Sequence, residues 1–568
     1  MIYSSITNMN RHLRGITGLL LIIILFFTFE KNVRAQENFT IKHEVTYSAD
    51  SQGITTVKEK ITIENLTNDS IATVYTTILK QISVYDIYAS DTKGVITPEV
   101  SRNNNDTSMK LNLRAQIVGK GKRNIIFLNY KTKDITQKVG QIWNVNIPKV
   151  LNQNSSDSYE VILVIPKSFG NKIFISPLPQ TAHENLTNFT YTFGDNEPLK
   201  DVGISASFGN FQTINFKLNY TMKNSSIFPI NQEISLPPDI TDVQTVYYDQ
   251  INPQPTKIYK DSDGNYMAVY KLKSWEILNV SAIGHAKIFS KQIDINAGGS
   301  FNSIPNAHIN SYTRPQKFWE SDSQEISQIS NNVRKTGQNV AVNAKYIYDY
   351  VVKNLKYDFD VINEENVNRK GAKEALTTKD VKGTACMEFT DSFIALARSL
   401  GIPAREIDGY AFSNADISTP LSVNLKGGDL LHAWPEFYDP NLGWVQVDPT
   451  WENTSGIDYF TKLDTNHFAF VIKGLNSEYP YPAGTYKFSP DEKQVEVDFS
   501  NNPDLQFEND VQIKNIWSWN IYELLKGGRK YRFTNKTGGT VYDIRNTGKD
   551  LLPFQSIELY LNLTNQKF

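Results

Sequence analysis

The stretch GTACMEFTDSFIALARSLGIP, residues 383–403, shows what kind of domain lies at the centre of this 568-residue chain. After Cys386 its apolar side chains recur every three or four positions, which is typical of an amphipathic helix. Gly401-Ile402-Pro403 then provides the signals that end a helix. Cys386 is therefore expected in the first turn, where free backbone amides and the helix dipole favour a reactive thiolate. The stretch predicts a cysteine nucleophile or, alternatively, a small cysteine buried on the apolar face of the helix.

Cys386 is also the only cysteine of the chain. Exported proteins usually use cysteines in pairs as disulfide bonds, and a lone cysteine cannot form one within its own chain. We therefore interpret Cys386 as a candidate for chemistry, provided that suitable partners lie elsewhere in the sequence.

Two candidate strands downstream carry a histidine and an aspartate in matching positions. The strands are LHAWPEFY, residues 431–438, and GWVQVD, residues 443–448. If Tyr438 pairs with Trp444, or if the pairing is shifted by two residues, the side chains of His432 and Asp448 lie on the same face of the sheet, because side chains alternate between faces. The carboxylate would then orient the imidazole, whereas an isolated histidine would be assigned a packing role. Together with Cys386 they would supply a nucleophile, a base and an orienting acid.

Several short motifs around these residues resemble the transglutaminase-like superfamily, whose core is related to the papain fold. The motifs are Gly383-Thr384-Ala385-Cys386, Gly401-Ile402-Pro403-Ala404-Arg405, Gly409-Tyr410, His432-Ala433-Trp434, and Trp444 followed by Asp448-Pro449-Thr450. The resemblance extends over residues 340–474. It implies that Cys386 is the nucleophile, His432 the base and Asp448 its orienting partner.

Three features depart from the pattern of this family. Two residues separate Gly383 from Cys386, where one is common in the family. Pro435 has no amide hydrogen, so its strand is expected to lie at an edge of the sheet or to be bulged there. The backbone amide of Cys386 is expected to be one oxyanion donor. The family takes the second donor from upstream of the cysteine, and no residue is assigned to that role.

Other polar and aromatic residues are weaker candidates. Trp434 and Trp444 could line a substrate cleft, although packing in the core explains them equally well. Arg405 and Glu436 are expected to form a structural ion pair, and the role of His467 is left open. No two of the seven histidines have ligand spacing on one predicted element, so we expect no metal site and no cofactor.

The whole chain is too long for one hydrophobic core and is expected to form several domains. Residues 36–224 contain short alternating runs that predict an antiparallel β-sandwich, and residues 225–296 continue it or form a second β module. Residues 297–315 are rich in Gly, Pro, Ser and Asn and are expected to be a linker. Residues 316–477 form the expected catalytic domain, and residues 478–568 return to short strands. The expected fold is an α+β papain- or transglutaminase-like core flanked by antiparallel β-sandwich-like modules.

The N-terminal segment, residues 1–35, has the features of a secretory signal. Positive charges precede an apolar run from Ile16 to Phe29, and cleavage is expected after Ala35. The apolar run has 14 residues, whereas a membrane-spanning helix needs about 20, so an uncleaved anchor is the less favoured alternative. The mature protein is therefore expected to be secreted, periplasmic or at the cell surface. Its Asn-, Lys- and Ile-rich composition is typical of bacterial proteins.

The net charge of −2 and the isoelectric point near 6.4 argue against nucleic acid or an anionic membrane as the main partner. A membrane contact is expected only through the N-terminal segment, if it is not cleaved. The leading hypothesis is an exported cysteine enzyme that acts on amide bonds of a peptide, protein or cell-wall peptide through a thioester. Transfer to water would make it a peptidase or amidase, and transfer to a lysine amine a transglutaminase. The alternative is a catalytically inactive surface scaffold or binding protein.

Overall fold

The computed structural model divides the chain into two compact units. One comprises residues 1–138 and 143–208, and the other comprises residues 139–142 and 209–568. The structure describes residues 2–6, 38–103, 106–148, 150–151, 157–194, 203–360, 368–379, 384–411, 423–424, 430–488, 492–502, 509–516 and 529–561.

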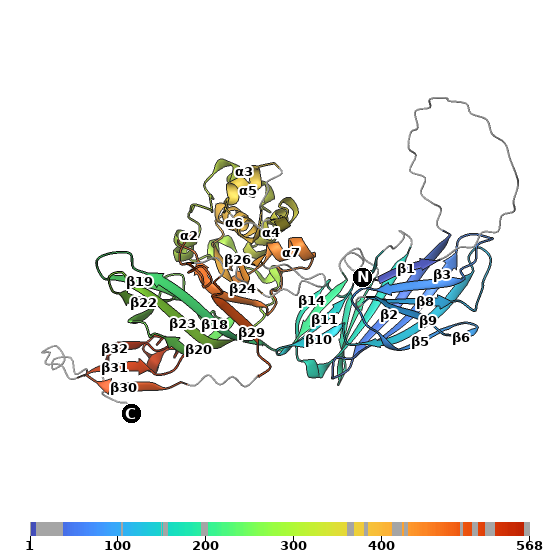
Figure 1. Ribbon diagram of the computed structural model, residues 1–568. Helices are drawn as coiled ribbons and strands as arrows, with labels where there is room; N and C mark the ends of the chain where they lie inside the picture. Colours follow the sequence, from blue (N-terminus) through green and yellow to red (C-terminus); the bar gives the residue numbers. More distant parts are fainter. Residues whose placement is uncertain are drawn as a thin grey trace, which may run out of the picture. The chain divides into compact units, whose positions relative to one another are not determined.

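The first unit is built from three β-sheets (Figure 1). The largest has the strand order β15 (Thr181–Glu184), β16 (Asn188–Phe193), β13 (Ser158–Pro166), β2 (Phe39–Ala49), β3 (Thr55–Asn65), β9 (Arg123–Thr132), β5 (Tyr85–Asp91) and β6 (Gly94–Ile96). The second has the order β12 (Val150–Leu151), β1 (Ile2–Ile6), β4 (Val74–Leu79), β8 (Asp106–Asn112) and β7 (Glu99–Asn103). The third has the order β10 (Thr136–Val139), β11 (Ile142–Ile147), β17 (Ile204–Phe208) and β14 (Lys172–Ser176).

These three sheets share one hydrophobic core. Ile61 of the large sheet, Tyr75 of the second and Ala206 of the third all belong to it. Buried residues alternate with more exposed ones along β2 and β13, as expected for strands with one face on the core. The predicted sandwich is thus confirmed, but its sheets are not wholly antiparallel. β13 runs parallel to β2, and β12 runs parallel to β1; neither pair is joined by a hairpin.

The second unit contains two further sheets. Their strand orders are β20 (Gln244–Asn252), β23 (Ile277–Ile288), β18 (Gln212–Lys223) and β29 (Val495–Phe499), and β19 (Ile230–Leu236), β22 (Tyr266–Leu272) and β21 (Lys257–Lys260). The first of these sheets crosses the domain boundaries that we expected at residues 224 and 478, because β18 pairs with β29. Alternation along a strand indicates that it has a buried face, but it does not indicate which distant strand will be its neighbour.

The C-terminal strands form a small separate sheet in the order β30 (Val511–Asn515), β31 (Arg529–Asn535) and β32 (Ser556–Leu561). Tyr531, Phe533, Ile544 and Leu551 make its core. The predicted return to short strands after residue 478 is therefore found in the described part of this segment.

Helices are concentrated in the remaining part of the second unit, where they gather over an antiparallel sheet (Figure 1). The helices are α2 (Asn306–Tyr312), α3 (Gln324–Val333), α4 (Val340–Asn354), α5 (Ala372–Thr377), α6 (Cys386–Ser399) and α7 (Pro449–Ser455). The sheet has the order β25 (Val423–Asn424), β26 (Leu430–Asp439), β24 (Ala404–Ala411) and β28 (His467–Lys473), and β27 (Gly443–Gln446) pairs with β26. α6 is almost entirely buried and packs on β26.

Residues 297–315, which we expected to be a linker, pack against the helical domain. Ile304 and Tyr312 are buried. A side chain at Gly298 would lie 2.9 Å from Asn339, and one at Gly299 would lie 2.8 Å from Pro440. The glycines of this segment therefore allow close packing of the backbone, which a composition typical of linkers does not distinguish from flexibility.

Within the described residues, no helix combines the length and the apolar character needed to cross a membrane. The predicted signal segment, residues 1–35, lies outside the described residues except for Ile2–Ile6, which form β1.

Candidate active site

Cys386 is the first residue of α6, in agreement with the predicted first-turn position. The turn before it is held by Glu388, whose carboxylate accepts hydrogen bonds from the backbone amides of Ala385, at 2.8 Å, and Lys370, at 3.1 Å. The Cys386 side chain is buried, with 6% of the residue exposed. Gly383, whose spacing from Cys386 departs from the family pattern, lies outside the described residues, so the effect of that spacing stays a prediction.

The strands that carry His432 and Asp448 adopt the expected register, in which Tyr438 pairs with Trp444. The expected strand up to Asp448 is too long, because β27 ends at Gln446. Asp448 instead caps α7, and its Oδ1 accepts a hydrogen bond of 3.0 Å from the Trp451 amide. The proline after Asp448 favours this helix start, since proline is well suited to the first helical position.

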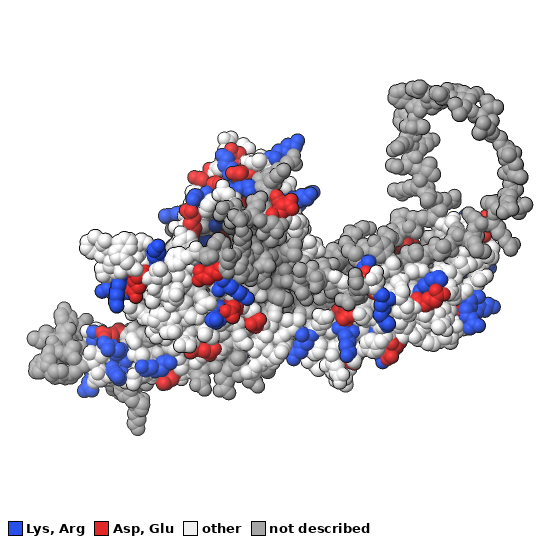
Figure 2. All heavy atoms as spheres, in the orientation of Figure 1, with Lys and Arg blue, Asp and Glu red and all other residues white. Residues whose placement is uncertain are grey.

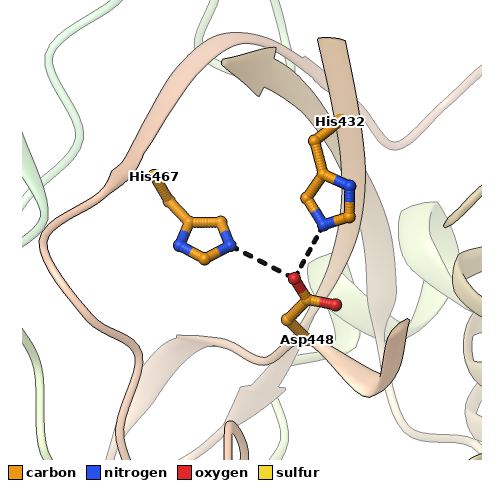
Figure 3. Close-up of side chains that lie close together, drawn as sticks. All are labelled: His432, Asp448 and His467. Carbon is orange, nitrogen blue, oxygen red and sulfur yellow. Dashed lines mark hydrogen bonds and ion pairs between the residues drawn. The ribbon is translucent and has the colours of Figure 1, made fainter. Parts of the chain in front are cut away.

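His432 and Asp448 form a fully buried pair, in which Nε2 of the imidazole donates a 2.7 Å hydrogen bond to Oδ2 of the carboxylate. Figure 3 shows that His467 reaches the same oxygen from β28. Its Nε2 donates to Asp448 Oδ2 at 3.2 Å, and its Nδ1 donates to Asp464 at 2.8 Å. The result is a continuous buried row of Asp464, His467, Asp448 and His432.

The charges in this row stabilise one another. Burial on its own would lower the pKa of His432, but the charge of Asp448, their hydrogen bond and the nearby Cys386 raise it to about 9. Burial likewise opposes protonation of His467, whereas Asp464 and then Asp448 raise its pKa to about 9. Burial would raise the pKa of Asp448, but His432 and His467 hold it below its ordinary value. At neutral pH the row therefore favours charged carboxylate and imidazolium groups.

Cys386 lies within electrostatic reach of His432, because it contributes to the raised pKa of that imidazole. Thr390, one helical turn after Cys386 on the same face of α6, donates a 3.1 Å hydrogen bond to the carbonyl of Ala433. This contact holds the cysteine-bearing face of the helix against the strand next to His432. The Nδ1 atom of His432 is buried and has no hydrogen-bond partner in the described part of the chain.

A comparison with known families identifies the domain that contains these residues. Residues 327–449 match the model of the transglutaminase-like superfamily, a span that contains Cys386, His432 and Asp448. The chain carries a transglutaminase-like domain.

Curated relatives are similar to limited stretches of the chain. An uncharacterized protein of Haemophilus influenzae is 34% identical over 117 residues, which are 18% of this chain and 30% of that protein. A protein-glutamine gamma-glutamyltransferase of Pseudomonas aeruginosa is 32% identical over 79 residues, which are 13% of this chain and 11% of that protein. The chain thus spans less than a third of the length of either relative.

Among solved structures, a Cytophaga hutchinsonii protein provisionally named as a cysteine protease is similar over 51% of this chain and 99% of its own. Its sequence identity is 17%, and its TM-score is 0.33.

Tyr357 is a polar residue next to the cysteine of the transglutaminase-like domain that sequence reasoning did not single out. Thr384 anchors the segment around it, because its hydroxyl donates to the Lys356 carbonyl at 2.6 Å and its carbonyl accepts from the Asp358 amide at 2.9 Å. Burial and then the charge of Cys386 raise the pKa of Tyr357, so its hydroxyl stays neutral. That hydroxyl is buried and makes no hydrogen bond to the described residues.

The two tryptophans proposed for a substrate cleft occupy different surroundings. Trp434 is fully buried, packs 5.9 Å from the His432 ring between centroids, and donates its indole hydrogen to Gln446 at 3.1 Å. Trp444 stacks 3.9 Å from the Arg405 guanidinium and also contacts Tyr312. Trp434 therefore supports the histidine from inside the transglutaminase-like domain, and the described contacts of Trp444 lie in another aromatic cluster.

Arg405 forms the expected structural ion pair with Glu436, which is fully buried. The guanidinium also donates to the carbonyl of Asp263 at 3.0 Å. The pair thus connects β24, β26 and the β21–β22 turn within the second unit, and its contacts are those of a structural residue.

His432, Asp448 and His467 also place three possible metal-binding atoms within 4.8 Å of one another. Sequence spacing did not reveal this group, because each residue lies on a different element. The same atoms already bond to one another, so a metal ion would have to displace both hydrogen bonds to Asp448. The arrangement is better suited to orienting an imidazole than to holding a cation.

Proposed function

We propose that the transglutaminase-like domain catalyses acyl transfer from an amide through a thioester on Cys386. The observation that carries this proposal is the orientation of His432. Its Nε2 is bonded to Asp448, whereas Nδ1 has no partner among the described residues and Cys386 lies within electrostatic reach of the ring. This is the division of roles that a base between a nucleophile and an orienting carboxylate requires.

In the first step the Cys386 thiolate attacks the carbonyl carbon of the amide. The resulting tetrahedral oxyanion then collapses and breaks the C–N bond, while His432 gives its Nδ1 proton to the departing amine. The product is a thioester between the acyl group and Sγ. In the second step His432 accepts a proton from the incoming water or amine, which attacks the thioester and releases Cys386.

We further propose Tyr357 as the oxyanion donor that the sequence left unassigned. Its hydroxyl is neutral, buried, near Cys386 and unpartnered within the described residues. The backbone amide of Cys386, in the first turn of α6, would be the other donor. A donor without a partner in the resting site can turn to a developing negative charge without first losing another bond.

The substrate that fits this proposal is an amide of a peptide, a protein or a cell-wall peptide, and the acyl acceptor is either water or an amine. The similarity to a protein-glutamine gamma-glutamyltransferase supports an amine as acceptor, and the chemistry of the triad is compatible with both. We also propose that the chain is exported after removal of residues 1–35, a cleavage that would take strand β1 out of the second sheet. The intact mass of the mature protein tests this, since retention of these residues would contradict cleavage.

The lone cysteine makes a decisive test of the activity possible. The full chain is incubated with a library of glutamine-containing and cell-wall peptides, with and without a primary amine, and acyl adducts are identified by mass spectrometry. We expect a thioester adduct on Cys386 and none on a Cys386→Ala variant. Free acid without added amine would identify a hydrolase, and product only with amine would identify a transferase. Absence of any adduct, together with slow alkylation of the folded protein by iodoacetamide, would overturn the proposal in favour of an inactive scaffold.

A further inference from the structure

Four large apolar side chains are exposed together at one end of the two adjacent β-sheets of the second unit. Ile227 and Phe228 lie in the loop between β18 and β19, and Trp275 and Ile277 lie at the turn between β22 and β23. Their exposed fractions are 66%, 68%, 65% and 57%. We call these four residues the apolar tip. Isolated exposed apolar residues are ordinary, but a group of this size usually marks an interaction site.

The two loops are fixed to each other by a buried asparagine. The Asn224 amide group donates to the carbonyl of Phe228 at 2.8 Å and to the carbonyl of Lys273 at 2.7 Å. The Trp275 amide donates to the Ser226 carbonyl at 3.3 Å. Asn224 itself is fully buried. The apolar tip is therefore held together by the fold, and its side chains are not exposed as the result of a loose loop.

Trp275 is also held in an unfavourable backbone conformation. Its φ of 58° lies in the left-handed region, which a bulky residue seldom adopts. Strain of this kind persists where the surrounding structure imposes it, and it is concentrated at functional positions. Here it presents the largest apolar side chain of the tip to solvent.

The charges within the two segments that form the apolar tip are mostly positive. Residues 223–231 and 271–277 contain the exposed lysines Lys223, Lys271 and Lys273 and one acidic residue, Glu276. Lys223 lies over the ring of Phe488, which is itself 56% exposed. In Figure 2 this end of the second unit appears as a white lobe with both blue and red spheres at its border. The net charge of the whole chain does not reveal this local excess of lysine.

We propose that the apolar tip docks on the surface of a bilayer that contains anionic phospholipid. Tryptophan and phenylalanine would enter the interface between headgroups and acyl chains, where tryptophan is favoured, and the three lysines would face the anionic headgroups. The apolar tip is formed by two loops at one end of the two adjacent β-sheets, a position that suits insertion into a membrane surface. This proposal does not depend on the activity of Cys386.

Flotation of the full chain with vesicles tests the proposal. One vesicle set is phosphatidylcholine alone, and the other contains added phosphatidylglycerol. We expect the unmodified chain to bind the second set. In the tip variant, which combines Trp275→Ser with Phe228→Ser, the partition coefficient should fall by at least about tenfold. In Tyr560→Ser it should not change. Tyr560 is a matched control because it is 59% exposed but lies on β32.

The charge contribution is tested separately. Replacing Lys223, Lys271 and Lys273 with glutamine should remove the preference for phosphatidylglycerol, and raising the salt from about 0.1 M to about 1 M should weaken binding of the unmodified chain. Equal binding of the tip variant and the unmodified chain would overturn the proposal. The proposal would also be overturned if the unmodified chain self-associates in sedimentation but binds no vesicles, and the tip variant does not self-associate. The apolar tip would then be an interface between copies of the chain.

Discussion

Nε2 of His467 lies 3.2 Å from Oδ2 of Asp448, the same carboxylate oxygen that accepts the 2.7 Å hydrogen bond from His432. The carboxylate therefore receives hydrogen bonds from two imidazoles at one oxygen and from a backbone amide at the other. With three bonds its orientation is closely defined, and so is the orientation of the His432 ring. His467 and Asp464 thus extend the proposed triad by a second pair of residues that would act through Asp448.

Replacement of His467 by glutamine removes the imidazole but leaves a side chain of similar reach. We expect the rate of acyl-enzyme formation to fall by about ten- to a hundredfold, because small errors in the position of a catalytic base have effects of this size. The initial rate of acyl-enzyme formation and the thermal unfolding midpoint are measured together. A lower rate at an unchanged midpoint indicates a positioning role for His467 and not a folding defect. Asp464→Asn, which still accepts the bond from His467 Nδ1, serves as the milder control. Equal rates for His467→Gln and the unmodified chain would show that Asp448 needs no such support.

Asp448→Asn tests the electrostatic role of the carboxylate without removing the helix cap, since asparagine also caps helices well. Asp448 makes the largest contribution that raises the pKa of His432 to about 9 against the effect of burial, and Cys386 adds to it. Without the charge of Asp448 the pKa of the imidazolium should fall from about 9 toward its ordinary value of about 6.5. We therefore expect the alkaline fall in acylation rate to move from about pH 9 toward about 6.5, and the maximal rate to fall by about 10³ to 10⁴. An unchanged pH profile would contradict the assignment.

Tyr357→Phe removes one hydroxyl group and nothing else. If that hydroxyl stabilises the oxyanion, the rate of acylation should fall by about 10² to 10³, with little change in substrate binding. Because it has no hydrogen-bond partner among the described residues, its loss should leave the unfolding midpoint unchanged or raise it. A variant that is destabilised but retains its rate would instead indicate a structural role for the hydroxyl.

A buried ion network under α6 provides a prediction about stability. Arg369 donates to the fully buried carboxylates of Asp391 on α6 and Glu406 on β24. Arg369→Met leaves both carboxylates without this partner, so we expect the domain to lose about 3–5 kcal/mol in its free energy of unfolding. The measurement is denaturant unfolding monitored by tryptophan fluorescence, with iodoacetamide labelling of Cys386 as a second reading.

The control for Arg369→Met is Lys317→Met, which breaks a largely exposed pair with Glu478. It should change the same free energy by less than about 1 kcal/mol. Similar losses in the two variants would show that the buried network contributes no more than a surface contact.

The parts of the site that could be predicted from the sequence are those set by local rules. The helix after Cys386 follows from apolar spacing, and the pairing of Tyr438 with Trp444 follows from the turn between two short strands. Strand alternation likewise predicted the sandwich of the first unit. In each case the interacting residues are close in the sequence or share one repeating pattern.

The parts that could not be predicted depend on contacts between distant segments. His467 reaches Asp448 from β28, and Tyr357 lies near Cys386 because Thr384 holds the segment around it. Neither residue belongs to a motif with fixed spacing. The pairing of β18 with β29 joins segments on both sides of the transglutaminase-like domain. Only the folded chain brings such residues together, so the sequence left the role of His467 open and did not single out Tyr357.

Asp448 has two separate duties, since one oxygen caps α7 and the other bonds to His432. A duplicated copy of this domain that no longer needed catalysis would be free to change Cys386 and His432. Selection for a stable helix would still preserve an aspartate or asparagine at position 448. In a lineage of such proteins this acid would therefore outlast the activity. The presence of this acid in a relative would indicate an intact fold. The cysteine and the histidine together would be the better markers of an active enzyme.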